Sequence, residues 1–119
     1  MPILELDIIG WPEDFADNLS QLLADSVGQA LNSRPQGTWV KLAFVEPRFY
    51  AENEGALDLP PVIARLLQAN TPKGKALKKQ IADLTRAISN ATNRPEASVH
   101  LILEPNAKGR TAFGGNLVE

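Results

Sequence analysis

The sequence lacks cysteine and has little histidine. None of its 119 residues is a cysteine, and His100 is the only histidine. Without thiols the chain forms no disulfide bond and offers neither a thiolate metal ligand nor a cysteine nucleophile. One imidazole gives little support to a histidine metal cluster or to a Ser/His/Asp triad. Much of the usual catalytic repertoire is therefore excluded or disfavoured.

A large net charge and long apolar runs are also missing. Lys+Arg 12 against Asp+Glu 14 leaves a formal net charge of −2, so no electrostatic feature favours nucleic acid or an anionic membrane surface. No apolar run approaches the roughly 20 residues of a membrane span. Glu5 and Asp7 lie where a secretory signal would be apolar. We expect a soluble, cytoplasmic protein that binds neither nucleic acid nor a membrane.

The same order of elements can be read twice along the chain. The first half runs from an apolar segment at 2–9 through a helical pattern to TWVKLAFVEP, and the second runs from PVIARLLQ through a helical pattern to ASVHLILEP. Pro35 and Pro95 end the two helical patterns. A strand, a helix and a strand in each half predict two βαβ units with right-handed crossovers.

The predicted architecture is an α+β (two-layer α/β) fold in one domain, 1–119. Its repeat units cover about 2–57 and 60–119, and together they form a four-stranded mixed sheet with two helices on one face. VKLAFVE and SVHLILE are almost continuously apolar, which predicts strands that are buried on both faces, or on one face and in a subunit interface. Residues 51–60 are expected to form a polar joint between the units.

Apolar residues at helical spacing define the two helices. The stripes consist of Phe15, Leu19, Leu22, Leu23, Val27, Ala30 and Leu31 in the first helix, and of Leu77, Ile81, Leu84, Ile88 and Ala91 in the second. Pro12 suits the first turn of the first helix, with Glu13 and Asp14 beside it. Pro72 is expected to mark the start of the second helix.

Proline directly follows Met1, and this position has chemical potential. Inside a strand a proline lacks the amide donor of other residues. If Met1 is removed, Pro2 becomes a secondary amine with a free lone pair. The pKa of an α-amino group is ordinarily about 7.7–8.0, and burial or a neighbouring cation lowers it. Pro2 is therefore a candidate general base for removing a proton next to a carbonyl.

The opening MPI, the doubled βαβ unit and the segment PNAKGRTAFGGNL together resemble the tautomerase superfamily, which includes 4-oxalocrotonate tautomerase. The second half carries most of the likeness: LTRAISNATNRPEASVHLILEPNAKGRTAFGG is similar to the helix, proline break, strand and terminal hairpin of the short tautomerases. The whole chain resembles a fused pair of such units.

The resemblance implies a tautomerase or isomerase that loses its initiator methionine and uses the proline as the base. The reaction would be keto–enol or double-bond isomerisation of a small 2-oxo acid, without a cofactor or a metal. The resemblance also implies a homotrimer. Pro61, which opens the second unit, is an amide within the chain and cannot be a base.

Short tautomerases hold the substrate carboxylate with arginines, and here the first arginine position is occupied by Gly10-Trp11-Pro12 and by Asn70-Thr71-Pro72. The second position falls on His100 and near Lys41. The candidate substrate-binding cations, in order of preference, are Arg48, Arg110, Lys41 and His100, with Arg48 and Arg110 expected in hairpins after the long strands. Phe113 matches the region of an apolar pocket wall. Each candidate also has an explanation that involves no substrate. Surface cations are usually solvated, and aromatic side chains in strands usually pack in cores or interfaces.

Two other functions stay open from the sequence. In one, a protonated Pro2 assists a hydratase, dehalogenase or decarboxylase-type reaction, and a carboxylate among Glu5, Asp7, Glu46 and Glu52 positions water. In the other, the chain is a non-catalytic trimeric binding protein on the same scaffold, because a fold alone does not fix a function.

Overall fold

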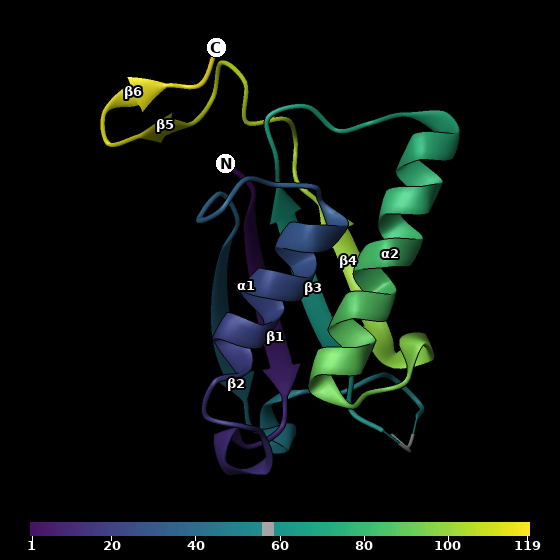
Figure 1. The fold of residues 1–119 in the computed structure, drawn as a ribbon. Coiled ribbons are helices and arrows are strands. Elements are labelled where there is room, and N and C mark those ends of the chain that lie inside the picture. The colour runs from purple at the N-terminus through teal and green to yellow at the C-terminus, as the bar shows by residue number, and fades with distance from the viewer. Residues whose placement is uncertain (56–58) are drawn as a thin grey trace.

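Two βαβ units share one mixed sheet in the computed structural model, which describes residues 1–55 and 59–119 (Figure 1). The first unit comprises β1 (Ile3–Ile9), α1 (Leu19–Ala30) and β2 (Trp39–Val45), and the second comprises β3 (Val62–Leu67), α2 (Gly74–Thr92) and β4 (Val99–Leu103). The strand order is β2-β1-β3-β4. β1 pairs parallel with β2 and antiparallel with β3, and β3 pairs parallel with β4. Both helices cover the same face, which confirms the predicted fold class.

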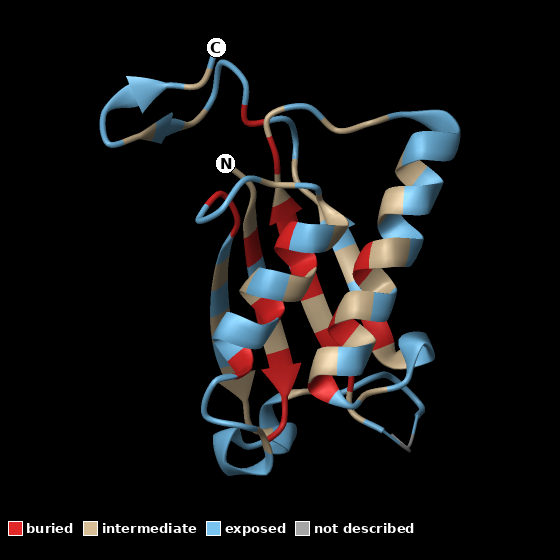
Figure 2. Cartoon of the chain, in the orientation of Figure 1, coloured by how far each residue is buried: buried red, intermediate tan, exposed pale blue. Residues whose placement is uncertain are grey.

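The core lies between this sheet face and the two helices (Figure 2). Because side chains alternate across a strand, Leu4, Leu6 and Ile8 point from β1 into the core, where each is at most 1% exposed. The helices contribute a matching set of buried residues, Leu19, Leu23, Val27, Leu84 and Ile88. The opposite sheet face carries the remaining side chains and is open in the single chain.

The start of the first helix differs from the prediction. Pro12–Asp14 form a separate 3-10 turn, η1, and Phe15 after it is extended, with φ −125° and ψ 159°. The Phe15 ring lies 5.5 Å from that of Phe44, so Phe15 belongs to the apolar pattern without being helical. The buried stripes are also narrower than predicted, because Leu22 and Ile81 are 44% and 37% exposed.

Both helices are followed by the same kind of break. Asn32 and Asn93 adopt left-handed conformations with φ of 58° and 55°, a common way for a helix to end. Pro35 and Pro95 then follow two or three residues later, in keeping with the prediction that the prolines exclude further helix. The two breaks support the interpretation of the chain as a repeat.

The long apolar strands β2 and β4 are the outer strands of the sheet. Along β2, exposed Trp39, Lys41 and Ala43 alternate with partly buried residues. The prediction that these strands are buried on both faces is therefore wrong for the single chain. Of the predicted joint at 51–60, residues 56–58 lie outside the described part of the chain.

The two long strands are followed by different structures. Arg48 lies in a 3-10 turn, η2 (Pro47–Phe49), so the hairpin expected there is wrong, while another 3-10 turn, η3 (Glu96–Ser98), precedes β4. The terminal hairpin is confirmed as β5 (Ala112–Phe113) and β6 (Asn116–Leu117), and it projects beside the start of the chain (Figure 1). Its turn needs Gly114 and Gly115, with φ of 58° and 85°. Within the described residues, no helix combines the length and apolar character that a bilayer crossing requires.

Candidate functional site

Pro2 lies at the end of the sheet from which the terminal hairpin projects. It immediately precedes β1 and is partly buried. Its carbonyl oxygen accepts a hydrogen bond of 3.0 Å from the backbone N–H of Trp39, at the start of the parallel strand β2. The Trp39 ring meets the Phe113 ring edge to face, with centroids 5.3 Å apart. Pro2 therefore has an aromatic pair from β2 and the hairpin in its neighbourhood.

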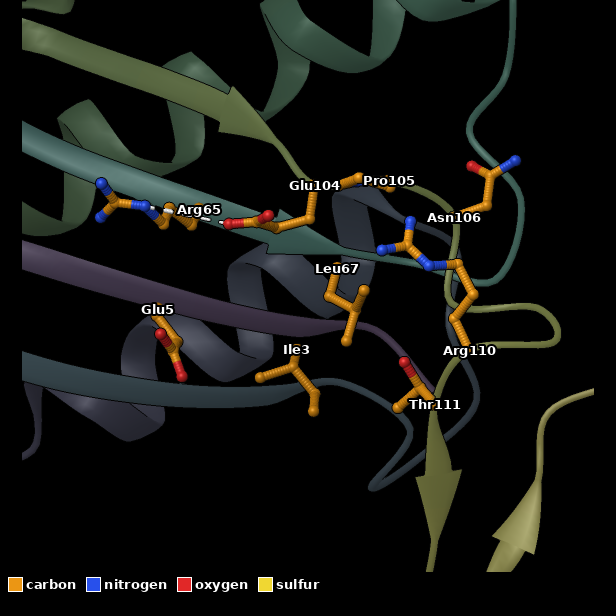
Figure 3. Close-up of a pocket in the computed structure, with 9 residues that line it drawn as sticks. All are labelled: Ile3, Glu5, Arg65, Leu67, Glu104, Pro105, Asn106, Arg110 and Thr111. Atoms are coloured by element: carbon orange, nitrogen blue, oxygen red, sulfur yellow. Dashed lines mark ion pairs between the residues drawn. The ribbon is translucent and has the colours of Figure 1, made fainter.

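A pocket of about 320 Å³ opens on the sheet face not covered by helices (Figure 3). Ile3, the residue after Pro2, contributes to its wall, so the pocket begins beside the candidate base. The full lining consists of Ile3, Glu5, Arg65, Leu67, Glu104, Pro105, Asn106, Arg110 and Thr111. Strands β1 and β3, the segment after β4 and the approach to the hairpin thus build a single cavity.

Arg110 is the one predicted substrate-binding cation in this lining. It sits in a turn whose backbone is held by hydrogen bonds from Arg110 N and Thr111 N to the carbonyl oxygen of Ala107, at 2.9 and 3.0 Å. Ala107 itself is only 2% exposed. In the described part of the chain no carboxylate forms an ion pair with Arg110, so its guanidinium is available for an anionic ligand.

Arg65 is a second pocket arginine, and it was not among the cations predicted from the sequence. Its guanidinium lies 3.4 Å from Asp7 Oδ2 and 3.8 Å from Glu104 Oε1, and Figure 3 shows it beside Glu104. Two carboxylates therefore offset its charge. The alternation of apolar and polar residues along β3 indicates that Arg65 points away from the core. Its place in the pocket depends on the pairing of β3 with β1.

The other predicted cations lie outside the pocket lining. Lys41 and His100 project from β2 and β4 onto the open sheet face, in register with Glu5 and Ile63. Lys41 Nζ is 4.0 Å from Glu5 Oε1. Phe113 is also outside the lining, although its contact with Trp39 keeps it near Pro2.

Arg48 lies at the opposite end of β1 from Pro2. β2 runs parallel to β1, and Arg48 comes three residues after Val45, the last residue of β2. At about 3.3 Å per residue, this strand separates the two by about 20 Å. Arg48 Nη2 lies 3.6 Å from Glu46 Oε2, and the guanidinium stacks over the Phe49 ring at 4.5 Å. The single chain therefore does not bring Arg48 to Pro2.

Across residues 1–55 and 59–119, no three His, Asp or Glu side chains gather as the ligands of a metal ion would. The described pocket groups are two carboxylates, two guanidinium groups, an amide and a hydroxyl. They suit polar binding and proton transfer more directly than metal ligation.

No protein-family model and no curated protein matches the sequence, but solved structures match the fold. Fused 4-OT F6, an asymmetric trimer, has a TM-score of 0.78 at 15% identity, with 97% of this chain and 94% of that chain covered. Pt0534 inactivated by 2-oxo-3-pentynoate has a TM-score of 0.77 at 18% identity, with 98% and 94% covered. Macrophage migration inhibitory factor from Oncomelania hupensis has a TM-score of 0.78 at 13% identity, with 100% and 83% covered. The chain thus has the tautomerase superfamily fold, and the resemblance is confirmed at that level.

Proposed function

We propose that the protein is a tautomerase that uses the amine of Pro2, after removal of Met1, to move a proton in a small 2-oxo acid. One observation carries the proposal: Pro2 precedes Ile3 at the margin of a pocket that holds the guanidinium of Arg110, which has no carboxylate partner among the described residues. The fold shared with fused 4-OT supports it.

The proposed reaction needs a base, an anion site and partial shelter from water. The Pro2 nitrogen removes a proton from the carbon next to the ketone, and the electrons of that C–H bond form the enolate. The proton is then returned to oxygen or to another carbon. Arg110 binds the carboxylate in bidentate fashion and keeps the reacting carbon near the base. The Trp39 and Phe113 pair would supply apolar surface that limits water near the start of the chain.

Methionine removal is a condition of this chemistry. While Met1 is attached, the Pro2 nitrogen belongs to an amide and has no useful basicity. A small second residue such as proline permits the removal. The proposal thus links catalytic activity to a mass difference that can be measured.

The open sheet face bears on the proposed homotrimer. Its apolar and charged residues have no second layer within the described chain, and fused 4-OT F6 is a trimer. A second copy is also what could bring Arg48 to the pocket, because in one chain Arg48 lies at the far end of β1. We therefore retain Arg48 as a substrate-binding residue of the assembled protein, and Lys41, His100 and Phe113 as residues at the margin of the site.

Covalent labelling tests the proposal most cleanly, because 2-oxo-3-pentynoate inactivates the structural neighbour Pt0534. The processed protein should gain one label on Pro2 and lose tautomerase activity towards phenylpyruvate and 2-hydroxymuconate in proportion. Pro2→Ala should take up the label far more slowly. A processed chain that tautomerises neither compound and carries no label on Pro2 would overturn the proposal.

A second candidate reaction is favoured by the carboxylates in the pocket. Glu5 and Glu104 both line it, and a carboxylate near a protonated Pro2 could position water for hydration or a decarboxylase-type reaction. Glu104→Gln should abolish such an activity while leaving phenylpyruvate tautomerisation within about twofold. A loss of both activities to the same extent would argue against the hydration role.

A further inference from the structure

Four charged side chains line the pocket, and two of them offset one another. Arg65 Nε and Glu104 Oε1 are 3.8 Å apart, and Arg65 also lies 3.4 Å from Asp7. Arg65 therefore faces two carboxylates, and Glu104 lies beside a cation that belongs to the pocket itself. Glu5 and Arg110 are left as the two pocket charges with the most freedom to meet a ligand.

Glu5 has two cationic neighbours in the sheet, but neither neutralises it closely. Its register partners are Lys41 on β2 and Arg65 on β3. Arg65 turns instead towards Asp7 and Glu104, and no ion pair joins it to Glu5 among the residues described. Lys41 reaches Glu5 only at 4.0 Å, with side chains that are 78% and 56% exposed. An exposed pair of this kind is worth little, so a ligand cation can replace Lys41 at small cost.

The two available charges lie at opposite ends of the pocket. In Figure 3, Glu5 and Arg110 are at its two sides, and Ile3 and Leu67 lie between them. Ile3 and Leu67 are register partners on β1 and β3, so the middle of the floor is apolar. Glu5 is one pleat repeat from Ile3, about 7 Å along the strand, and a ligand that meets both charges must span more than this.

We propose that the pocket selects compounds with a carboxylate at one end, an apolar middle and a cation at the other, with Arg110 binding the carboxylate and Glu5 the cation. Together with the proposed function, on which this part rests, the inference names the substrate class as 2-oxo acids with a distal ammonium or guanidinium group. Glu5 is then the residue that determines specificity, and it takes no part in the proton transfer.

Equilibrium binding tests the inference without requiring turnover. Calorimetry on the processed protein at low ionic strength compares three unreactive acids: 3-(4-guanidinophenyl)propanoate, 3-phenylpropanoate and 3-(4-carboxyphenyl)propanoate. The guanidino compound should bind about tenfold more tightly than the neutral one, in line with one charge-assisted hydrogen bond. The dicarboxylate should bind most weakly, because Glu5 repels its second charge.

Two variants assign the preference to Glu5. Glu5→Gln should reduce the ratio of guanidino to neutral affinity to about one, with the affinity for 3-phenylpropanoate nearly unchanged. Lys41→Gln should raise the ratio, since it removes the competing cation. As a control, Arg110→Gln should weaken all three acids alike and leave the ratio as it was.

Several results would overturn the inference. A ratio of guanidino to neutral affinity near one in the unmodified protein would do so. That ratio is expected if a cation of a second copy occupies Glu5. An unchanged ratio in Glu5→Gln, or no binding of any of the three acids, would have the same meaning. Failure of the proposed function looks different, because the affinity order would then hold in a protein that does not tautomerise phenylpyruvate.

Discussion

Arg94 Nη2 donates a hydrogen bond of 2.9 Å to the carbonyl oxygen of Ile9. Its Nη1 donates one of 2.6 Å to the carbonyl oxygen of Pro60. Ile9 ends β1, Pro60 precedes β3 and Arg94 follows α2, so one guanidinium joins the two repeat units. The same group lies 5.4 Å from the centre of the Phe15 ring. Burial lowers the pKa of Arg94, and the charge of Asp14 acts in the opposite direction.

Replacing this side chain should destabilise the protein. Arg94→Ala leaves two carbonyl groups without their charged donor, and we expect the free energy of unfolding to fall by about 2–3 kcal/mol. Arg34→Ala is the matched control, because Arg34 occupies the same place in the first repeat and makes no side-chain hydrogen bond within the described residues. Urea unfolding of both variants measures the difference. Equal midpoints would show that the contacts of Arg94 contribute nothing to stability.

Two adjacent leucines of α1 test which face of the helix packs against the sheet. Leu23 is 0% exposed and Leu22 is 44% exposed. Leu23→Ala should lower the free energy of unfolding by about 3 kcal/mol, because it removes buried methyl groups and leaves a cavity. Leu22→Ala should cost less than about 1 kcal/mol. The reverse order in thermal unfolding would mean that α1 presents a different face to the sheet.

Arg110 is predicted to bind the substrate carboxylate. Arg110→Gln should raise KM for a 2-oxo acid by about tenfold to a hundredfold, which corresponds to the loss of a charged hydrogen bond. Arg86→Gln removes an arginine from the exposed surface of α2, where Arg86 Nη1 lies 3.8 Å from Asp83, and should leave KM unchanged. Steady-state kinetics decide between them. Indistinguishable KM values would remove Arg110 from the site.

The sole tyrosine offers a titration test. The Tyr50 hydroxyl donates a hydrogen bond of 2.7 Å to Glu52 Oε2, and this bond, with burial and the charge of Glu52, raises the pKa of Tyr50 above its ordinary value of 10.0. The contribution of the Tyr50–Glu52 hydrogen bond to stability is therefore complete below pH 10.0, and it is lost as the pH rises through the higher pKa of Tyr50 in the folded protein. Phenolate absorbance should show a lower midpoint in Glu52→Ala. Identical midpoints would contradict the contact.

Local signals in the sequence were enough for much of the fold. Apolar spacing predicted both helices, and Pro35 and Pro95 predicted where helix could no longer continue. Phe15 was misplaced because a helical spacing of apolar residues does not reveal that its ring packs from an extended residue against Phe44. The open sheet face could not be distinguished from a buried one, because Ala43 and Ile102 look like core residues in a sequence.

The candidate site was predicted less completely than the fold. Pro2 was predicted from its place after Met1 and Arg110 from the resemblance, whereas Arg65 required knowledge that β3 pairs antiparallel with β1, a contact between residues far apart in the sequence. The distance of Arg48 from Pro2 within one chain did follow from the predicted βαβ unit, since the start of one parallel strand and the end of the next lie at opposite edges of the sheet. That consequence was available from the sequence alone.

Intact mass, combined with the kinetics of one variant, tests the role of the Pro2 amine. The purified protein should have the mass of the chain without Met1, and Pro2→Ala, which should be processed in the same way, should lower kcat/KM for phenylpyruvate by at least about a hundredfold, the scale of general base catalysis. Retention of Met1 in an active protein, or equal kcat/KM in the two processed proteins, would contradict catalysis by this amine.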